Sequence, residues 1–150
     1  MIKVLMVCLG NICRSPLAEG ILQSKVDADR VLVESAGTGG WHIGELPDPR
    51  SVKVATQHYI DITDQRCRKF GYADFDNFDI IYVMDSSNLR DVQMMAKNEN
   101  DLQKVHLILN AIYPNQNKDV PDPYYEGNDG FEKVFQMLDS ACDRIVDNII

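Results

Sequence analysis

Four short apolar runs constrain the fold of this chain more than any other feature of its sequence. They are almost continuously hydrophobic and comprise Lys3–Cys8, Val31–Ser35, Asp79–Met84 and Val105–Leu109. A strand without polar alternation must be covered on both faces, as the strands of parallel sheets are. Helical patterns separate the runs, and such strand–helix alternation is typical of parallel sheets with right-handed crossovers. We therefore predict a three-layer α/β fold, with a four-stranded parallel sheet and helices on both faces.

The helices are predicted from apolar residues at three- and four-residue spacing. The expected segments are Pro16–Val26, Arg50–Tyr59, Ser86–Lys97 and a long C-terminal helix. Asp48 and Pro49 form a capping residue and a first-turn proline for the second helix. The C-terminal helix is the clearest because one apolar stripe runs from Phe131 to Ile149, with Asn128 or Asp129 as its cap.

Length, charge and cysteine content exclude several classes of protein. The 150 residues fit one domain over residues 1–150, and the net charge of −8 disfavours nucleic acid and anionic membranes as partners. The N-terminal apolar stretch, Ile2–Leu9, is too short for an export signal or a membrane span. We therefore expect a cytoplasmic protein with four reduced cysteines. Their spacing does not favour a zinc site, and we expect no metal and no cofactor.

The loop after the first strand carries the strongest chemical signal. Residues 8–16 read Cys-Leu-Gly-Asn-Ile-Cys-Arg-Ser-Pro, so Cys8 and Arg14 have the spacing C-x5-R. In open α/β sheets the functional site lies at the carboxyl ends of the strands, where this loop begins. A short loop entering a helix N-terminus directs backbone N–H groups inward and forms an anion cradle. The planar fork of Arg14 can close such a cradle on two phosphate oxygens.

A thiol at the base of this cradle fits a nucleophile. The donors that bind an anion also stabilise a thiolate, and the Ser15 hydroxyl can donate to the sulfur. Cys8 would then attack a bound phosphoryl group. The alternative is that Cys8 is a small buried hydrophobe at the end of a strand and that Arg14 lies on the surface of the next helix.

The segment Val120–Tyr125 supplies a candidate acid and candidate pocket walls. Two prolines stiffen the backbone around Asp122, and aromatic neighbours could exclude water from its carboxyl group. An ordinary Asp-Pro turn explains Asp122 equally well. A slot for an aromatic ring could be lined by four side chains, those of Leu9, Trp41, Tyr124 and Tyr125. For Trp41, core packing is the simpler interpretation on sequence grounds alone.

The remaining cysteines and the histidines receive no role. Cys142 lies on the apolar stripe of the last helix and is expected in the core. Cys67 lies within a basic stretch, Arg66–Lys69, that we expect to be solvated. His42, His58 and His106 show no ligand spacing.

Together these motifs resemble the low-molecular-weight protein tyrosine phosphatase family. The resemblance rests on residues 7–16, 35–38, 41–44, 84–85 and 122–125, in the order of the family and over essentially the whole chain. It implies a flavodoxin-like fold, metal-free hydrolysis and a phosphocysteine intermediate. One departure is Cys67, where a small residue such as Ala or Ser is expected, far from the chemistry.

The resemblance also assigns roles to individual positions. It implies that Cys8 is the nucleophile, Arg14 the phosphate clamp and Asp122 the general acid, which then activates water. The loop residues that bind phosphate or support the loop are Leu9, Gly10, Asn11, Ile12, Cys13 and Ser15. Of these, Ser15 tunes the thiolate and Asn11 braces the loop through its left-handed backbone. The pocket walls are Leu9, Trp41, Tyr124 and Tyr125.

Regulation and partners follow as expectations. In the family the cysteine at position 13 can form a disulfide with the nucleophile, so we expect a peroxide-sensitive Cys8–Cys13 pair. The alternative is that Cys13 only packs beneath the loop. The expected partners are phosphotyrosine-containing proteins, among them a tyrosine kinase, and the chain is expected as a monomer or weak homo-oligomer.

Two other functions use the same scaffold. A thiol-coupled arsenate reductase shares the C-x5-R loop, but it needs resolving cysteines close together on a mobile segment, and Cys67 has no companion nearby. A non-catalytic phosphotyrosine-binding module could lose the nucleophile or the acid, whereas Cys8, Arg14 and Asp122 are all present.

Overall fold

All four predicted strands form one parallel sheet. The computed structural model describes residues 1–149, apart from the side chains of Tyr125 and Asn128. The sheet contains β1 (Ile2–Cys8), β2 (Val31–Gly37), β3 (Ile80–Val83) and β4 (Val105–Leu107) in the order β2-β1-β3-β4. Every pairing is parallel, and β1 lies between β2 and β3. The predicted sheet is thus confirmed.

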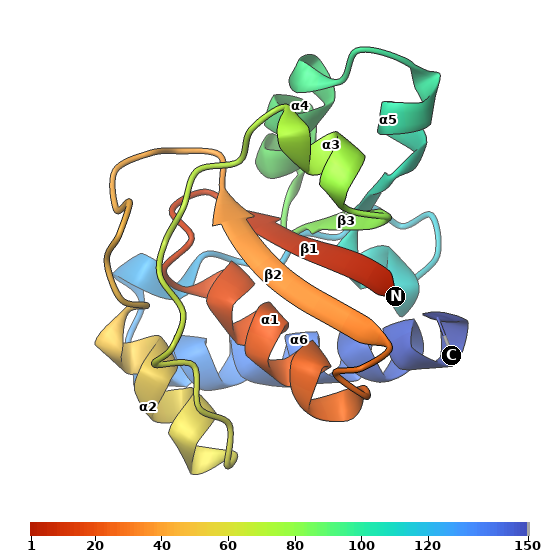
Figure 1. The fold of residues 1–150 in the computed structure, drawn as a ribbon. Coiled ribbons are helices and arrows are strands. Elements are labelled where there is room, and N and C mark those ends of the chain that lie inside the picture. The colour runs from red at the N-terminus through yellow and green to blue at the C-terminus, as the bar shows by residue number, and fades with distance from the viewer. Residues whose placement is uncertain (150) are drawn as a thin grey trace.

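Helices cover both faces of this sheet (Figure 1). On one side lie α1 (Arg14–Lys25), α2 (Pro49–Gln57) and α6 (Asn128–Ile149), and on the other lie α3 (Ala73–Asn77), α4 (Ser86–Met95) and α5 (Glu99–Gln103). Two 3₁₀ turns, η1 (Ile108–Ala111) and η2 (Pro123–Tyr125), complete the chain. The short helices α3 and α5 were not predicted, because five residues are too few to display a helical period.

Successive side chains of β1 alternate between two hydrophobic cores. Val4, Met6 and Cys8 belong to the core beneath α1 and α6, whereas Leu5 and Val7 belong to the core beneath α4. All five side chains are at most 2% exposed. This double coverage is the reason that the strand is apolar throughout.

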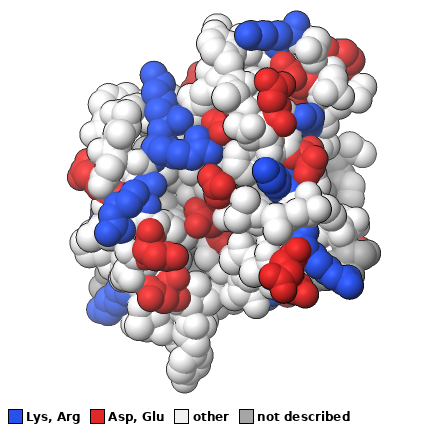
Figure 2. Space-filling model, in the orientation of Figure 1, with Lys and Arg blue, Asp and Glu red and all other residues white. Residues whose placement is uncertain are grey.

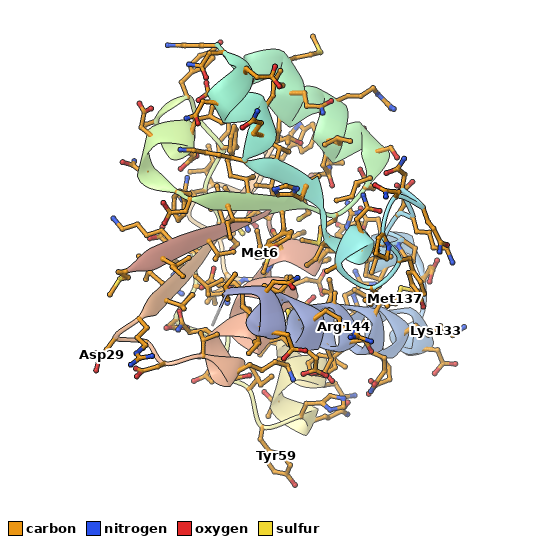
Figure 3. All side chains as sticks on the ribbon, turned by 90° about the vertical axis from the view of Figure 1, so that its right-hand side faces the viewer. Met6, Asp29, Tyr59, Lys133, Met137 and Arg144 are labelled. Atoms are coloured by element: carbon orange, nitrogen blue, oxygen red, sulfur yellow. The ribbon has the colours of Figure 1, made fainter. Side chains whose placement is uncertain are left out.

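The helix ends agree with the predicted caps in one case and differ in another. The Asp48 side chain accepts a hydrogen bond from the Arg50 amide, as a cap of α2 with Pro49 in the first turn. By contrast, neither predicted cap of α6 is confirmed, because the helix already begins at Asn128, whose side chain lies outside the described part of the chain, and Asp129 lies in its first turn. Lys133, Met137 and Arg144 are exposed, on the side of α6 turned to the viewer in Figure 3, whereas Val134, Leu138, Ala141 and Ile145 are buried. The apolar stripe therefore faces the core, as its period predicts.

The connections diverge at the centre of the sheet. The chain leaves β1 for α1 on one face, and it leaves β3 for α4 on the opposite face (Figure 1). In doubly wound sheets such a reversal opens a crevice outside the carboxyl ends of the two strands. Cys8 ends β1 at this crevice. Among residues 1–149, no helix has the length and apolar character needed to cross a membrane.

Candidate active site

The loop after β1 wraps around the sulfur of Cys8. The Asn11 amide donates a hydrogen bond to Cys8 Sγ over 3.3 Å, and Ser15 Oγ lies 3.0 Å from the same sulfur. Asn11 has a φ of 55°, in the left-handed region that asparagine tolerates better than most residues. This conformation lets the loop close in a few residues and enter α1 at Arg14.

Donors outside the loop hold its carbonyl groups. The pairs are Thr38 N to Cys8 O (2.9 Å), Gly39 N to Leu9 O (2.8 Å), Cys67 Sγ to Asn11 O (2.8 Å), Asp48 N to Ile12 O (2.8 Å) and Ser51 Oγ to Cys13 O (3.3 Å). In a trans peptide group the N–H points away from the C=O. Because these carbonyls are held by groups outside the loop, the N–H groups of the same peptides point into it. The loop is therefore a cradle for an anion.

Arg14 is fixed at the edge of this cradle. Its side chain is 2% exposed, and Nη1 donates to Asp85 Oδ2 over 2.6 Å and to the Val120 carbonyl over 2.9 Å. Burial alone would lower the pKa of the guanidinium, but the charges of Cys8, Asp85 and Asp122 together raise it above its usual value. Arg14 is therefore a permanent cation, held in one orientation by the loops that follow β3 and precede η2.

Asp122 lies opposite Arg14 at the mouth of the cradle. Its Oδ2 is 3.7 Å from Arg14 Nη2, and its side chain is 39% exposed. Its Oδ1 accepts a hydrogen bond from the Tyr124 amide over 3.0 Å, which caps the short turn η2. The carboxyl group is thus held by its own backbone segment while one oxygen faces the cradle.

A chain of hydrogen bonds leads from the Cys8 sulfur to the side chain of Glu19. Asn11 Nδ2 donates to Ser15 Oγ (2.8 Å) and to Ser35 Oγ (2.9 Å), and Ser35 Oγ donates to Glu19 Oε1 (2.7 Å). Both hydrogens of the Asn11 amide are used in this way. The hydroxyl hydrogen of Ser15 therefore remains for Cys8 Sγ, with the Ala36 carbonyl, at 3.5 Å, as a longer alternative.

Glu19 is an unusual carboxyl group because it is largely withdrawn from water, with only part of the residue exposed. Burial raises the pKa of Glu19 to about 7, and the hydrogen bond from Ser35, which favours the ionised form, offsets only part of this effect. Near neutral pH its protonated and ionised forms are therefore both populated.

A pocket of about 330 Å³ opens above the cradle. Its lining residues are Cys8, Leu9, Gly10, Ile12, Cys13, Arg14, Trp41, His42, Asp122 and Tyr124. Trp41 is 69% exposed, so the core-packing interpretation of this residue is wrong. A Cβ atom at Gly39 would lie 2.2 Å from the Trp41 ring, so the absence of a side chain at Gly39 lets the ring lie against the backbone.

The opposite wall of the pocket is tied to α2. The guanidinium carbon of Arg50 lies 5.3 Å from the centroid of the Tyr124 ring and 4.6 Å from that of Phe131. Arg50 also pairs with Asp48 at 3.0 Å. These contacts connect the segment that carries Asp122 to the helix beside the cradle. The side chain of Tyr125, the other predicted wall residue, lies outside the described part of the chain.

Comparison with known proteins identifies the family. The model of the low molecular weight phosphotyrosine protein phosphatase family matches residues 3–149. This chain belongs to that family. A low molecular weight phosphotyrosine protein phosphatase of Schizosaccharomyces pombe is 43% identical over 142 residues, which cover 91% of this chain and 90% of the relative.

Solved structures agree with this assignment. A protein tyrosine phosphatase from Entamoeba histolytica has a TM-score of 0.91 at 34% identity, covering 99% of this chain and 96% of its own. A Drosophila arginine phosphatase has a TM-score of 0.89 at 33% identity, and the match covers 98% of this chain and 97% of that phosphatase. The chain is thus a phosphatase with the flavodoxin-like fold that these relatives share.

In this phosphatase the structure brings together the site residues predicted from the sequence, except that the side chain of Tyr125 is not described. Cys8, Arg14 and Asp122 line one pocket with Leu9 and Trp41. Cys13 also lines it, yet its side chain is 4% exposed. All four cysteines are free thiols. Burial, followed by the charge of Asp48, raises the pKa of Cys13 far above its usual range.

Several residues of the site were not identified from the sequence. Asp85 directly follows the third apolar run, and a carboxylate at the carboxyl end of a central strand was a usable signal. His42, which received no role, lines the pocket, and its Nδ1 lies 2.9 Å from Glu45 Oε2. Ser35 belongs to the 35–38 segment of the resemblance but received no role, and Glu19 carried no recognisable pattern, because only folding places the two behind the loop.

The interpretation of Cys67 was wrong. This residue is 4% exposed and its sulfur contacts the backbone of the loop, so it lies neither in solvent nor far from the chemistry. Its basic neighbours explain the error, since Arg66 and Lys69 are exposed whereas the intervening cysteine points inward.

Proposed function

We propose that the chain hydrolyses phosphotyrosine in proteins by way of a phosphocysteine intermediate. The observation that carries the proposal is the ring of donors around Cys8 Sγ, closed by the buried Arg14. Such a ring stabilises a thiolate and, above it, the three non-bridging oxygens of a phosphoryl group. We assign catalysis to Cys8, Arg14 and Asp122.

In the first step the Cys8 thiolate attacks phosphorus in line with the departing oxygen. The S–P bond forms while the bond from phosphorus to the tyrosyl oxygen breaks. The amides of the cradle and Arg14 hold the non-bridging oxygens, whose charge they match before the reaction begins. Asp122, at the mouth of the same cradle, gives its proton to the departing tyrosyl oxygen.

In the second step water cleaves the phosphocysteine. Asp122 is now a carboxylate, and it takes a proton from the water that attacks phosphorus. The S–P bond breaks, Cys8 returns to its thiolate form, and inorganic phosphate is released. The Ser15 hydroxyl, 3.0 Å from Cys8 Sγ, favours this departure because it donates to the leaving thiolate.

The pocket walls support an aromatic leaving group. Leu9, Trp41 and Tyr124 line the entrance, and this largely apolar and aromatic surface favours a flat phenyl ring. Because the cradle lies below these walls, we expect phosphotyrosine to react in preference to the shorter phosphoserine. Since one structural relative is an arginine phosphatase, phosphoarginine is the informative third substrate.

The decisive experiment measures phosphate release from a phosphotyrosine peptide in the presence of EDTA. We expect turnover by the wild type, none by Cys8→Ser, and slower turnover of a matched phosphoserine peptide, and we include a phosphoarginine peptide as the third substrate. Comparable rates on the phosphoserine peptide would contradict the assigned specificity. A folded wild type without turnover would refute the phosphatase mechanism. Arsenate reduction with added thiols and phosphotyrosine binding would then distinguish a reductase from a binding module.

The role of Asp122 is tested through the leaving group. Asp122→Asn should lower kcat for phenyl phosphates of high leaving-group pKa by about 10²- to 10⁴-fold, the range typical of a general acid. Esters with acidic phenols need less protonation and should lose less. If the variant and the wild type depend equally on leaving-group pKa, Asp122 does not donate the proton.

A reversible oxidation of Cys8 by peroxide, resolved by Cys13 as a disulfide, is the proposed regulation. Peroxide converts the Cys8 thiolate to a sulfenic acid, and the Cys13 sulfur displaces water to form the disulfide. We expect peptide mapping after peroxide treatment to recover a Cys8–Cys13 crosslink that dithiothreitol reverses. In Cys13→Ser the oxidised enzyme should fail to recover. Absence of the crosslink would remove the switch.

The proposed cellular setting follows from the chemistry. A nucleophilic thiol must stay reduced, so we propose a cytoplasmic location.

On the face seen in Figure 2, basic and acidic side chains lie interspersed. Phosphotyrosine proteins, including a tyrosine kinase, are the proposed partners, and we propose a monomer or weak homo-oligomer, which analytical ultracentrifugation tests.

A further inference from the structure

We propose that Cys67 is a positioning residue for phosphoryl transfer, because its thiol holds the Asn11–Ile12 peptide with the Ile12 N–H facing the phosphate. This inference rests on the proposed function of the cradle. The observation is the hydrogen bond from Cys67 Sγ to the Asn11 carbonyl oxygen, 2.8 Å long and buried.

The thiol is itself held firmly in place. The Cys67 amide donates to the Glu45 carbonyl over 2.9 Å, and the Cys67 carbonyl accepts from the Gly44 amide over 2.8 Å. The next residue, Arg68, donates its amide to Asn11 Oδ1 over 3.0 Å. Residues Cys67 and Arg68 therefore donate hydrogen bonds to both the backbone and the side chain of Asn11.

The peptide that Cys67 holds is the one that most needs an external restraint. It follows Asn11, whose left-handed φ of 55° places it at the tightest point of the loop. Rotation of this peptide plane would turn the Asn11 carbonyl oxygen toward the phosphate and remove the Ile12 N–H from it. Of the five loop carbonyls paired above, this one is held by a thiol, whereas backbone amides and a hydroxyl hold the others.

A thiol can act as this donor only while it keeps its proton. Burial, followed by the charges of Glu45 and Cys8, raises the pKa of Cys67 to about 11. At neutral pH the group is therefore an S–H donor. The next nearest acceptor is the Leu46 carbonyl, 4.0 Å away, so the Asn11 carbonyl is its main partner.

Three substitutions separate the hydrogen bond from the volume of the side chain. Cys67→Ala removes the donor and leaves space, Cys67→Val fills the space without a donor, and Cys67→Ser restores a donor. We expect the inhibition constant of orthophosphate to rise, and kcat/KM to fall, by roughly tenfold in the Ala and Val variants. Serine should return both values to within about threefold of the wild type.

Cys142 provides the matched control. It is a second buried thiol, fully enclosed on α6 in the core, and its substitution removes volume without touching the loop. Cys142→Ala should lower the unfolding midpoint while leaving the orthophosphate constant and kcat/KM unchanged. A general loosening of the fold would change the orthophosphate constant and kcat/KM in the Cys67 and Cys142 variants alike. Loss of cradle positioning would change these two values only in the Cys67 variants.

The amide proton of Ile12, followed by NMR, gives the most direct readout. Binding of orthophosphate should move this resonance downfield in the wild type. In Cys67→Val the phosphate-induced shift of Ile12 should shrink, whereas the shift of the Arg14 amide proton should stay as in the wild type. Unchanged phosphate affinity, kcat/KM and Ile12 shift in folded Ala and Val variants would overturn the proposal. Because phosphate binding is measured without turnover, this outcome is distinct from an inactive wild type, which would refute the proposed function.

Discussion

Replacing Glu19 by Gln should make the stability of this phosphatase less sensitive to pH. Glu19 is partly buried behind the cradle and accepts a hydrogen bond from Ser35 at 2.7 Å. Burial raises its pKa from the ordinary 4.5 to about 7. A glutamine keeps the size of the side chain and the acceptor oxygen for Ser35, but it cannot ionise. The variant therefore removes the charge and little else.

The sign and size of the effect follow from this pKa. Between pH 4.5 and 7 the folded chain holds a proton on Glu19 that the unfolded chain has released, so the free energy of unfolding falls as pH rises. The penalty is absent below pH 4.5 and complete above pH 7. At about 1.4 kcal/mol for each factor of ten in the protonation equilibrium, it amounts to about 3 kcal/mol. Relative to the wild type, Glu19→Gln should gain this amount between about pH 5 and pH 8.

Urea unfolding followed by circular dichroism at several pH values measures this difference. Subtracting the two proteins at each pH cancels the groups that both share. Glu132→Gln is the matched control, because the hydrogen bond from His58 lowers the pKa of Glu132. That carboxylate stabilises the fold above its ordinary pKa of 4.5 and loses the contribution as pH falls below it, so the slope that the control removes has the opposite sign and lies below the window in which Glu19 titrates. A difference between Glu19→Gln and wild type that stays constant from pH 5 to pH 8 would refute the burial argument.

Three further predictions concern the cradle and the pocket. Asp85→Asn removes the charge 2.6 Å from Arg14, so kcat/KM should fall and the orthophosphate inhibition constant should rise by about 10- to 100-fold; unchanged constants would show that Arg14 needs no partner. Asn11→Gly keeps the left-handed backbone but loses the hydrogen bonds to Ser15 and Ser35. Its free energy of unfolding, measured in urea, should fall by about 1–3 kcal/mol. Asn11→Ala should lose more, because alanine also strains the left-handed φ at this position. Equal stability of the two variants would contradict the backbone argument. Trp41→Ala should raise KM for a phosphotyrosine peptide several-fold without changing inhibition by orthophosphate, and a parallel change in both would place the Trp41 side chain in the phosphate site.

Much of the fold was predictable because it depends on patterns that are local in sequence. The apolar run at β1 and the stripe of α6 each follow from the faces that must be buried. The short helices α3 and α5 escaped prediction, since five residues do not complete two helical turns. Capping was predictable at Asp48, where a proline follows, whereas α6 already includes both predicted caps, Asn128 and Asp129, because helix bounds depend on packing.

The site divides in the same way. The C-x5-R loop lies within one stretch of chain between a strand and a helix, so Cys8, Arg14 and Ser15 could be assigned from spacing and chemistry. Trp41 could not be placed, because an aromatic side chain satisfies the same pattern in a core or at a pocket, and only the folded chain shows it exposed at the pocket against Gly39.

The sequence by itself determined the sheet, the position of the loop and the residue types that could hold and transfer a phosphoryl group. These depend on spacing within a few residues and on the requirement to bury apolar surface. Only the tertiary structure decided which groups hold the loop in its active shape. Asp85 reaches Arg14, Ser35 and Glu19 support Asn11, and Cys67 turns its thiol to the Asn11 carbonyl. Such hydrogen bonds join residues far apart in the chain, and they exist only after the strands bring their carboxyl ends together.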